Sequence, residues 1–143
     1  MKEITVYSLK ELQEFAFRFA SCLKGNEIIL LRGNLGSGKT TFVRYLVKSL
    51  GGDEFEVTSP TFTIMNEYES KLGVIFHLDL YRVDSFDITD IVGEGIILIE
   101  WPKEDYTLYN YPVIELEFSV SEENNRHITI KPLYKSEYIL NCV

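Results

Sequence analysis

Hydrophobic residues along the 143-residue chain follow two periods, one typical of buried strands and one typical of amphipathic helices. Short apolar runs within 27–31 and 96–99 are typical of strands that are buried on both faces of a sheet. Residues 74–80 predict a third, mostly buried strand. Residues 113–120 alternate at period two and 127–130 resume after a turn, which predicts a C-terminal hairpin.

Two other segments carry apolar residues at helical spacing. The first follows Ser8, which forms a capping-box pattern with Glu11 three residues later. Its apolar face consists of Leu12, Phe15, Ala16, Phe19, Ala20 and Leu23. The second helix is predicted by Phe42, Val43, Leu46, Val47 and Leu50, and Gly51-Gly52 ends it. Strands and helices therefore alternate in the first part of the chain, as in an α/β fold.

The sequence Gly33-Asn34-Leu35-Gly36-Ser37-Gly38-Lys39-Thr40 joins a predicted strand to the second helix. It matches G-x-x-x-x-G-K-T, the phosphate-binding loop of nucleoside triphosphatases, in which backbone N–H groups and a helix N-terminus bind phosphates. We expect Gly36, Ser37, Gly38 and Thr41 to bind phosphate, and Lys39 to neutralise the β- and γ-phosphates. The Thr40 hydroxyl would be a Mg²⁺ ligand. A chance glycine-rich turn is the alternative, and the matching flanks argue against it.

Two acidic residues end predicted strands. Asp79 lies near the end of 74–80, and Glu100 directly follows 96–99. A carboxylate at the C-terminal end of a strand beside a phosphate loop suits a residue that organises Mg²⁺. The pattern leaves open which of the two holds the metal and which a water. It also leaves open whether Trp101 belongs to the core or covers the site.

Two further residues have an ordinary and a functional interpretation. Thr61 lies in Ser59-Pro60-Thr61-Phe62, which the residue pattern alone favours as a strand or loop. The alternative is a switch segment in which Thr61 senses the γ-phosphate or its Mg²⁺. His77, within the strand that ends at Asp79, is most simply a hydrogen-bonded strand histidine.

The length, composition and charge of the chain limit the classes of protein to which it can belong. The length fits one domain over residues 1–143, and no apolar run of about 18 residues predicts a membrane span. The N-terminal sequence has no apolar segment typical of a secretory signal, and with a phosphate loop present we expect Cys22 and Cys142 to be reduced in the cytoplasm. The net charge of −8 argues against a broad nucleic-acid surface.

Four segments in order resemble the TsaE (YjeE) family: Gly33–Thr41, Ser59-Pro60-Thr61-Phe62, His77-Leu78-Asp79-Leu80-Tyr81-Arg82 and Glu100-Trp101-Pro102. A phosphate loop alone is common, whereas the ordered set is specific to this family. The resemblance implies a P-loop NTPase-like, three-layer α/β domain with a mixed, mainly parallel central sheet and a C-terminal hairpin.

The resemblance also implies residue roles. Gly36, Ser37, Gly38, Lys39, Thr40 and Thr41 would hold ATP, and Thr40 and Glu100 would bind Mg²⁺. Asp79 would organise water near the metal, Thr61 would belong to a switch segment, and Trp101 would lie by the site. Arg126 and the residues around Leu9 would contact the nucleotide. The segment between Asp79 and Glu100 is shorter than in many relatives, which puts in doubt any partner contact made by an insert there.

For function, the resemblance implies a slow ATPase in tRNA threonylcarbamoyladenosine synthesis, with TsaD and TsaB as partners. TsaD transfers the threonylcarbamoyl group to an adenosine next to the anticodon, and ATP hydrolysis would reset the complex. The negative charge favours contact with tRNA only through these partners. A small metabolite kinase is an alternative, but beyond the helix that follows the loop only Arg82 and Arg126 could clamp a phosphate. An ATP-gated binding scaffold is the other alternative.

Overall fold

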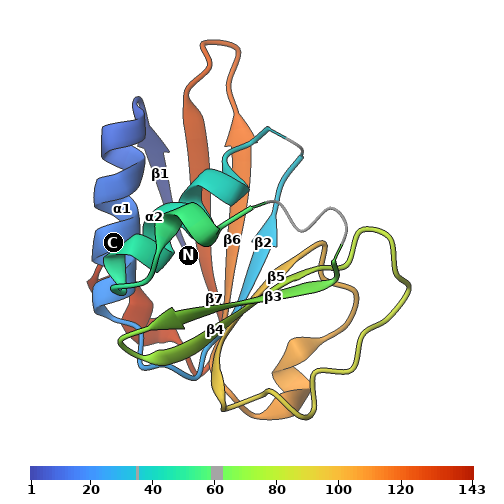
Figure 1. The fold of residues 1–143 in the computed structure, drawn as a ribbon. Helices are drawn as coiled ribbons and strands as arrows, with labels where there is room; N and C mark the ends of the chain where they lie inside the picture. Colours follow the sequence, from blue (N-terminus) through green and yellow to red (C-terminus); the bar gives the residue numbers. More distant parts are fainter. Residues whose placement is uncertain (35, 59–62) are drawn as a thin grey trace.

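The computed structural model describes residues 1–34, 36–58 and 63–143 (Figure 1). Its strands are β1 (Lys2–Val6), β2 (Ile28–Arg32), β3 (Met65–Ser70), β4 (Gly73–Asp79), β5 (Gly95–Glu100), β6 (Val113–Val120) and β7 (Arg126–Tyr134). Its α-helices are α1 (Leu9–Ser21) and α2 (Lys39–Ser49), and its 3₁₀-helices are η1 (Glu54–Glu56), η2 (Tyr106–Tyr109) and η3 (Glu137–Asn141).

The strands in the described residues form one mixed sheet in the order β1-β7-β6-β2-β5-β4-β3. The four central strands β6, β2, β5 and β4 are parallel to one another. The outer strands pair antiparallel, including the predicted hairpin of β6 and β7. The expected mixed, mainly parallel centre with a C-terminal hairpin is therefore confirmed.

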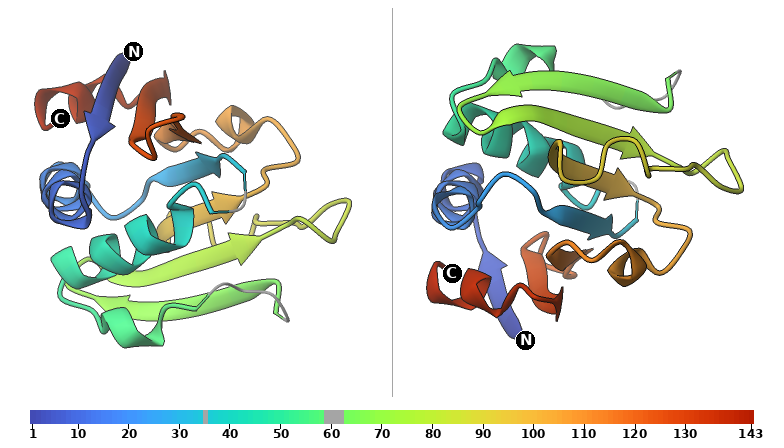
Figure 2. Two further views of the ribbon diagram at one scale, coloured as in Figure 1. Left: turned by 90° about the horizontal axis from the view of Figure 1, so that it is seen from above. Right: turned by 90° about the horizontal axis from the view of Figure 1, so that it is seen from below.

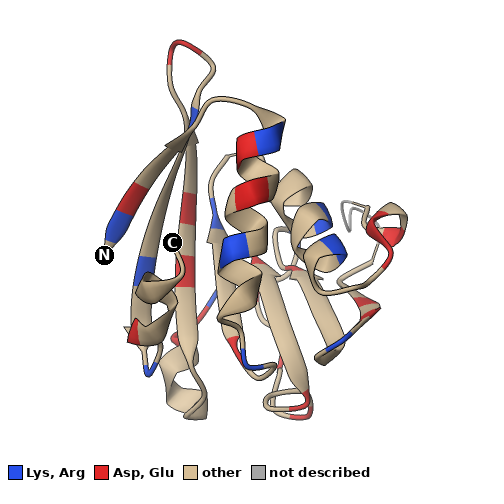
Figure 3. Cartoon of the chain, turned by 90° about the vertical axis from the view of Figure 1, so that its left-hand side faces the viewer, with Lys and Arg blue, Asp and Glu red and all other residues tan. Residues whose placement is uncertain are grey.

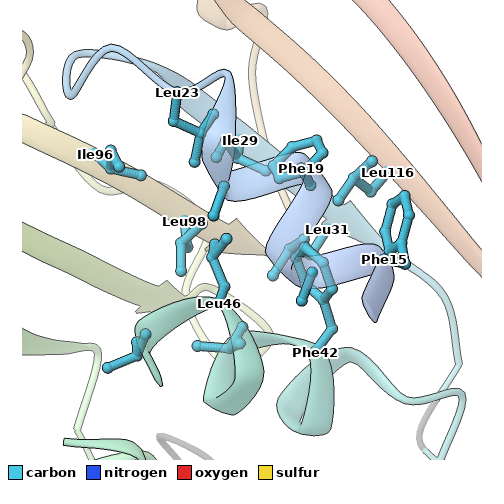
Figure 4. Packing of buried hydrophobic residues seen from close by; sticks show 14 of the residues in the cluster. Phe15, Phe19, Leu23, Ile29, Leu31, Phe42, Leu46, Ile96, Leu98 and Leu116 are labelled. Atoms are coloured by element: carbon cyan, nitrogen blue, oxygen red, sulfur yellow. The ribbon is translucent and has the colours of Figure 1, made fainter. Parts of the chain in front are cut away.

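Successive side chains of β2 enter two separate cores because a strand alternates its side chains between two faces. Ile29 and Leu31 belong to the core shared with α1 and α2, whereas Ile28 and Leu30 belong to the core on the other face. Figure 4 shows Phe15 and Phe19 of α1 meeting Phe42 of α2 over the first face. The Phe42 ring centroid lies 5.7 Å from each of these rings, and all three side chains are fully buried.

The opposite face of the sheet is covered mainly by connecting segments, without an α-helix among the described residues. Leu80 and Ile88 from the segment after β4, and Tyr106 from η2, pack there against Ile97 and Ile99 of β5. Figure 2 shows η2 and these loops across the sheet from α1 and α2. The third layer is thus built from a 3₁₀-helix and loops, which the sequence pattern did not indicate.

Both helices follow the predicted patterns. The Ser8 hydroxyl accepts a hydrogen bond from the Glu11 backbone N–H at 3.1 Å, so the predicted cap begins α1. The apolar residues assigned to both helix faces are all buried. α2 ends before Gly51, whose φ of 81° lies in the left-handed region that favours glycine.

Cys22 and Cys142 are joined by a disulfide, so the expectation of two reduced thiols is wrong for this structure. Cys22 directly follows α1, and η3 returns the end of the chain to it, with the two Cα atoms 6.1 Å apart. The Tyr138 hydroxyl of η3 donates to the Glu27 carboxylate at 2.6 Å and helps to hold this return. Separation along the sequence had concealed this proximity.

None of the helices in the described ranges has both the length and the apolar character needed to cross a bilayer.

Candidate phosphate-binding site

The glycine-rich loop leaves the carboxyl end of β2, which lies between β5 and β6 in the sheet, and leads into α2 (Figure 1). This end of parallel strands is where α/β folds bind ligands. Gly33 has φ 145°, and a Cβ there would come within 2.6 Å of the Phe118 carbonyl oxygen. Gly36 and Gly38 have φ values of 79° and 108°. The glycines therefore permit a backbone path that an L side chain would obstruct.

Lys39, the first residue of α2, lies over the loop instead of extending into solvent. Its Nζ donates to the Gly33 carbonyl oxygen at 2.5 Å and lies 3.9 Å from Glu100 Oε1. The Lys39 side chain is only 5% exposed. Burial lowers the pKa of Lys39, and the charges of Glu100 and Asp79 oppose this effect. The site thus holds a desolvated ammonium group beside two carboxylates.

Asp79 and Glu100 are direct neighbours at the ends of the parallel strands β4 and β5. Glu100 is 4% exposed, and its Oε2 lies 2.7 Å from Nε2 of His77. Asp79 is partly exposed, and its Oδ1 accepts a hydrogen bond from the Tyr81 backbone N–H at 2.9 Å. The two acids therefore lie in different surroundings: Glu100 is held inside the site, and Asp79 lies at its rim.

Trp101 covers Lys39. The Lys39 Nζ lies 4.4 Å from the Trp101 ring centroid, a cation–π distance. The Tyr81 ring packs against the Trp101 ring, with 5.0 Å between the ring centroids. Trp101 has φ 58°, which is uncommon for a residue with a bulky side chain. Of the two interpretations of Trp101, the structure supports the one in which it lies over the site.

Arg126 comes to the loop from the start of β7. A Cβ on Gly38 would lie 2.8 Å from Arg126 Nε, so the arginine side chain crosses directly over this glycine. Arg126 Nε and Ser37 Oγ are buried and have no hydrogen-bond partner among the described residues. Ser37 also lines a hollow of about 540 Å³ between the loop and the end of β6. Unpaired buried polar groups are costly, so a polar ligand at this place would relieve them.

These features fit a nucleoside triphosphate with Mg²⁺. The unpaired Nε of Arg126 and the ammonium group of Lys39 suit phosphate oxygens. Thr40 follows in the first turn of α2, where the first N–H groups of a helix lack intrahelical partners. Its hydroxyl and the carboxylates of Asp79 and Glu100 are oxygen donors, the ligand type that Mg²⁺ prefers.

Comparisons with known proteins bear on the family of the chain. The family model described as "Threonylcarbamoyl adenosine biosynthesis protein TsaE" matches residues 6–128. The chain belongs to the TsaE family. The tRNA threonylcarbamoyladenosine biosynthesis protein TsaE of Aquifex aeolicus is 44% identical over 91% of this chain and 96% of its own length. The protein of the same name from Rickettsia typhi is 36% identical over 89% of this chain and 92% of its own.

The fold is shared with a solved structure. The crystal structure of Bacillus subtilis YdiB matches with a TM-score of 0.76, covering 98% of this chain and 91% of that one at 24% identity.

Some of the residues implied by the TsaE resemblance lie at the site, and others do not. Arg126 reaches the glycine-rich loop, as described above. Leu9 begins α1 at the same end of the sheet, because Val6 of the preceding strand pairs with Arg126. The Leu9 side chain is 52% exposed, so it is not packed into the site. Thr41 is half-buried in the first turn of α2. Thr61 lies outside the described residues.

His77 has a larger place in the site than its sequence position suggested. Its ring joins Glu100 to the Tyr68 hydroxyl, which lies 2.9 Å from Nδ1. The sequence did contain one signal: His77 precedes Asp79 by two residues and therefore lies on the same face of β4. That its partner would be Glu100 depended on the pairing of β4 with β5, which the sequence pattern does not give.

Proposed function

We propose that this protein is a Mg²⁺-dependent ATPase subunit of tRNA threonylcarbamoyladenosine synthesis, which binds the TsaB–TsaD complex and resets it by hydrolysing ATP. The observation that carries the proposal is the position of Lys39, with Nζ 2.5 Å from the Gly33 carbonyl oxygen and 3.9 Å from Glu100. A buried lysine beside an acid at a strand end suits phosphoryl transfer. The family membership supplies the pathway.

In this proposal each group at the site has one task. The backbone of Gly36–Thr41 binds the phosphates, and Lys39 neutralises charge on them. Thr40 and Glu100 hold Mg²⁺, which when bound neutralises charge on the β- and γ-phosphate oxygens. Asp79, at the exposed rim, orients the attacking water. Arg126 contributes its guanidinium to the nucleotide, and Trp101 limits access of water to Lys39.

The site is open on the side of Asp79, and we expect hydrolysis by the isolated protein to be slow. Asp79 is only partly buried, and Tyr81 beside it is 61% exposed. A partner that covers this rim would exclude water and strengthen the electrostatic interactions within the site. TsaB and TsaD are the expected partners.

We expect contact with tRNA to be made through these partners. The net charge is −8, and Figure 3 shows acidic and basic positions interspersed along α1 instead of one basic stripe. Glu122 and Glu123 add negative charge at the tip of the β6–β7 turn. Direct tRNA binding would need clustered Lys and Arg side chains to displace counterions. The proposed reaction places the protein in the cytoplasm.

The test is tRNA modification by purified TsaB and TsaD, supplied with a threonylcarbamoyl donor, with and without this protein. We expect modification beyond one turnover only when this protein and ATP are both present. Glu100→Ala should abolish the later turnovers, whereas Glu69→Ala, which changes an exposed carboxylate of β3, should not. Full multiple-turnover activity with Glu100→Ala would refute the ATPase proposal and favour the ATP-gated scaffold.

A further inference from the structure

A buried chain of polar side chains crosses the sheet beneath the N-terminal end of α2. It runs from Tyr68 on β3 through His77 on β4 to Glu100 on β5, and then to Lys39. The distances are 2.9 Å from the Tyr68 hydroxyl to Nδ1 and 2.7 Å from Nε2 to Glu100 Oε2. His77 is fully buried, and Tyr68 is 3% exposed. These hydrogen-bonded side chains therefore lie in the low-dielectric interior, where hydrogen bonds are strongest.

The direction of the hydrogen bonds follows from the partners. A carboxylate only accepts, so Nε2 of His77 must carry a proton to bond Glu100. Burial raises the pKa of Tyr68, so its hydroxyl keeps its proton and can donate to Nδ1. Tyr68 thereby favours the tautomer in which the proton of a neutral ring is on Nε2. The Tyr68 hydroxyl and Nε2 of His77 thus both donate in the direction of Glu100.

The two oxygens of Glu100 consequently have different surroundings. Oε2 is occupied by the His77 ring, and Oε1 faces Lys39 at 3.9 Å. We infer that His77 is a positioning residue that fixes the Glu100 carboxylate so that Oε1 points into the phosphate site, with Tyr68 setting its tautomer. The inference deepens the proposed function and rests on it for its effect on ATP hydrolysis.

A purely structural role makes a different prediction. A histidine that only fills the space between β3 and β5 would, when replaced by an apolar residue, change stability and leave turnover per folded molecule intact. A positioning role would lower kcat, because groups that orient functional side chains typically contribute 10- to 100-fold to activity or metal affinity. ATP affinity would change little, because His77 does not reach the loop that binds the phosphates.

The experiment compares His77→Leu with His77→Gln in the full chain, both assayed with TsaB and TsaD below their unfolding temperatures. Leucine removes the donor, whereas the glutamine side-chain nitrogen lies the same number of bonds from the backbone as Nε2. We expect His77→Leu to lower kcat by about 10- to 100-fold with an ATP Kd within about threefold of wild type. His77→Gln should recover most of kcat. Equal kcat for all three proteins would overturn the inference, as would a glutamine variant no better than leucine.

A double-mutant cycle identifies the residue through which His77 acts. In a Glu100→Gln background, His77→Leu should cause little further loss of kcat, because the side chain that it orients is already impaired. Tyr68→Phe should have a smaller effect than His77→Leu, because it removes only the outer hydrogen bond. A full additional loss in the Glu100→Gln background would contradict action through Glu100.

A measurement on the unaltered protein needs neither folding of a variant nor activity. Proton–nitrogen correlation spectra of the ¹⁵N-histidine-labelled protein at pH 8 should show the buried ring with a proton on Nε2 and none on Nδ1. An unprotonated Nε2 would overturn the inference even in an active ATPase. A protonated Nε2 in a protein that never hydrolyses ATP, with or without its partners, would instead refute the proposed function and leave the His77–Glu100 contact standing.

Discussion

Two lysines on α2 form ion pairs of nearly equal length in different surroundings. Lys39 lies 3.9 Å from Glu100 with both side chains 5% exposed, and Lys48 lies 3.8 Å from Glu54 with side chains 49% and 21% exposed. We predict that replacing each lysine by methionine, which keeps most of the apolar stem, will weaken ATP binding only at Lys39 and will have similar, small consequences for stability.

The stability prediction for Lys39→Met follows from two opposing effects. At an effective dielectric constant of about 20, charges 3.9 Å apart attract by roughly 4 kcal/mol. Desolvation of Lys39 opposes this attraction and is the larger effect, because the pKa of Lys39 is lowered. Glu100 also retains its hydrogen bond from His77. We therefore expect the free energy of unfolding at pH 7 to change by only about 1 kcal/mol or less, and that of Lys48→Met by about 0–1 kcal/mol.

The pH dependence gives the sign of the desolvation effect. Because the folded-state pKa of Lys39 lies below the ordinary value of 10.5, the unfolded chain binds more protons in the interval between the two. The stability penalty from the charged lysine is thus present below the folded-state pKa and is relieved as the pH rises toward 10.5. Over this pH interval the free energy of unfolding of the wild type, measured by urea unfolding, should increase relative to that of Lys39→Met.

ATP binding should separate the two variants. Lys39→Met removes one desolvated ammonium group from the phosphate site and should raise the Kd for ATP about 100-fold, equivalent to about 2.7 kcal/mol of binding free energy. Lys48→Met should bind as wild type, as measured by isothermal titration calorimetry with Mg²⁺. A loss of about 3 kcal/mol or more of stability in Lys39→Met would refute the argument that desolvation outweighs attraction. Equal ATP affinity in the two variants would refute the phosphate site.

Three further predictions concern other parts of the chain. In Gly38→Ala the new Cβ would lie 2.8 Å from Arg126 Nε, so the substitution should lower the free energy of unfolding by about 2–3 kcal/mol and weaken ATP binding. Gly73 is the matched control, because it has φ 93° but no atom within 4 Å of the position of a Cβ. Gly73→Ala should lower the free energy of unfolding by about 1–2 kcal/mol and leave ATP affinity unchanged. Tyr138→Phe should lose about 1.5–3 kcal/mol at pH 7 by urea unfolding, because it removes a hydrogen bond to Glu27. Burial, followed by the interaction with Glu27, raises the pKa of Tyr138. The contribution of the Tyr138 hydroxyl to stability is therefore fully present below pH 10 and is lost as the pH rises through the folded-state pKa. Above pH 10 the free energy of unfolding of the wild type should fall more steeply than that of the variant, and equal slopes would contradict this. Reduction of the disulfide with dithiothreitol should lower the free energy of unfolding by about 2–5 kcal/mol, and an unchanged value would mean that the cysteines are not paired in solution.

The parts of the fold that depend on local pattern could be predicted from the sequence. The period-two alternation of residues 113–120 predicted β6, the turn after them predicted its hairpin partner β7, and helical spacing predicted the buried faces of α1 and α2. The place of the glycine-rich loop between β2 and α2 could also be predicted, because its glycines and Lys39 follow one another in the sequence, and its binding of phosphate stays a prediction.

What could not be predicted depends on contacts between distant segments. The pairing of Asp79 with Glu100 and the bond from His77 to Glu100 arise only when β4 and β5 associate. Arg126 reaches Gly38 because the β6–β7 hairpin returns beside the loop. Local sequence cannot specify such pairings, since they depend on sheet order and register.

Steady-state ATP hydrolysis, measured for the protein alone and then with purified TsaB and TsaD, tests the central claim most directly. We predict a slow basal rate with Mg²⁺ that rises when both partners are added, and that Glu100→Gln prevents this rise. A rate that the partners leave unchanged, or a partner-stimulated rate that persists in Glu100→Gln, would contradict an ATPase whose site is completed by those partners.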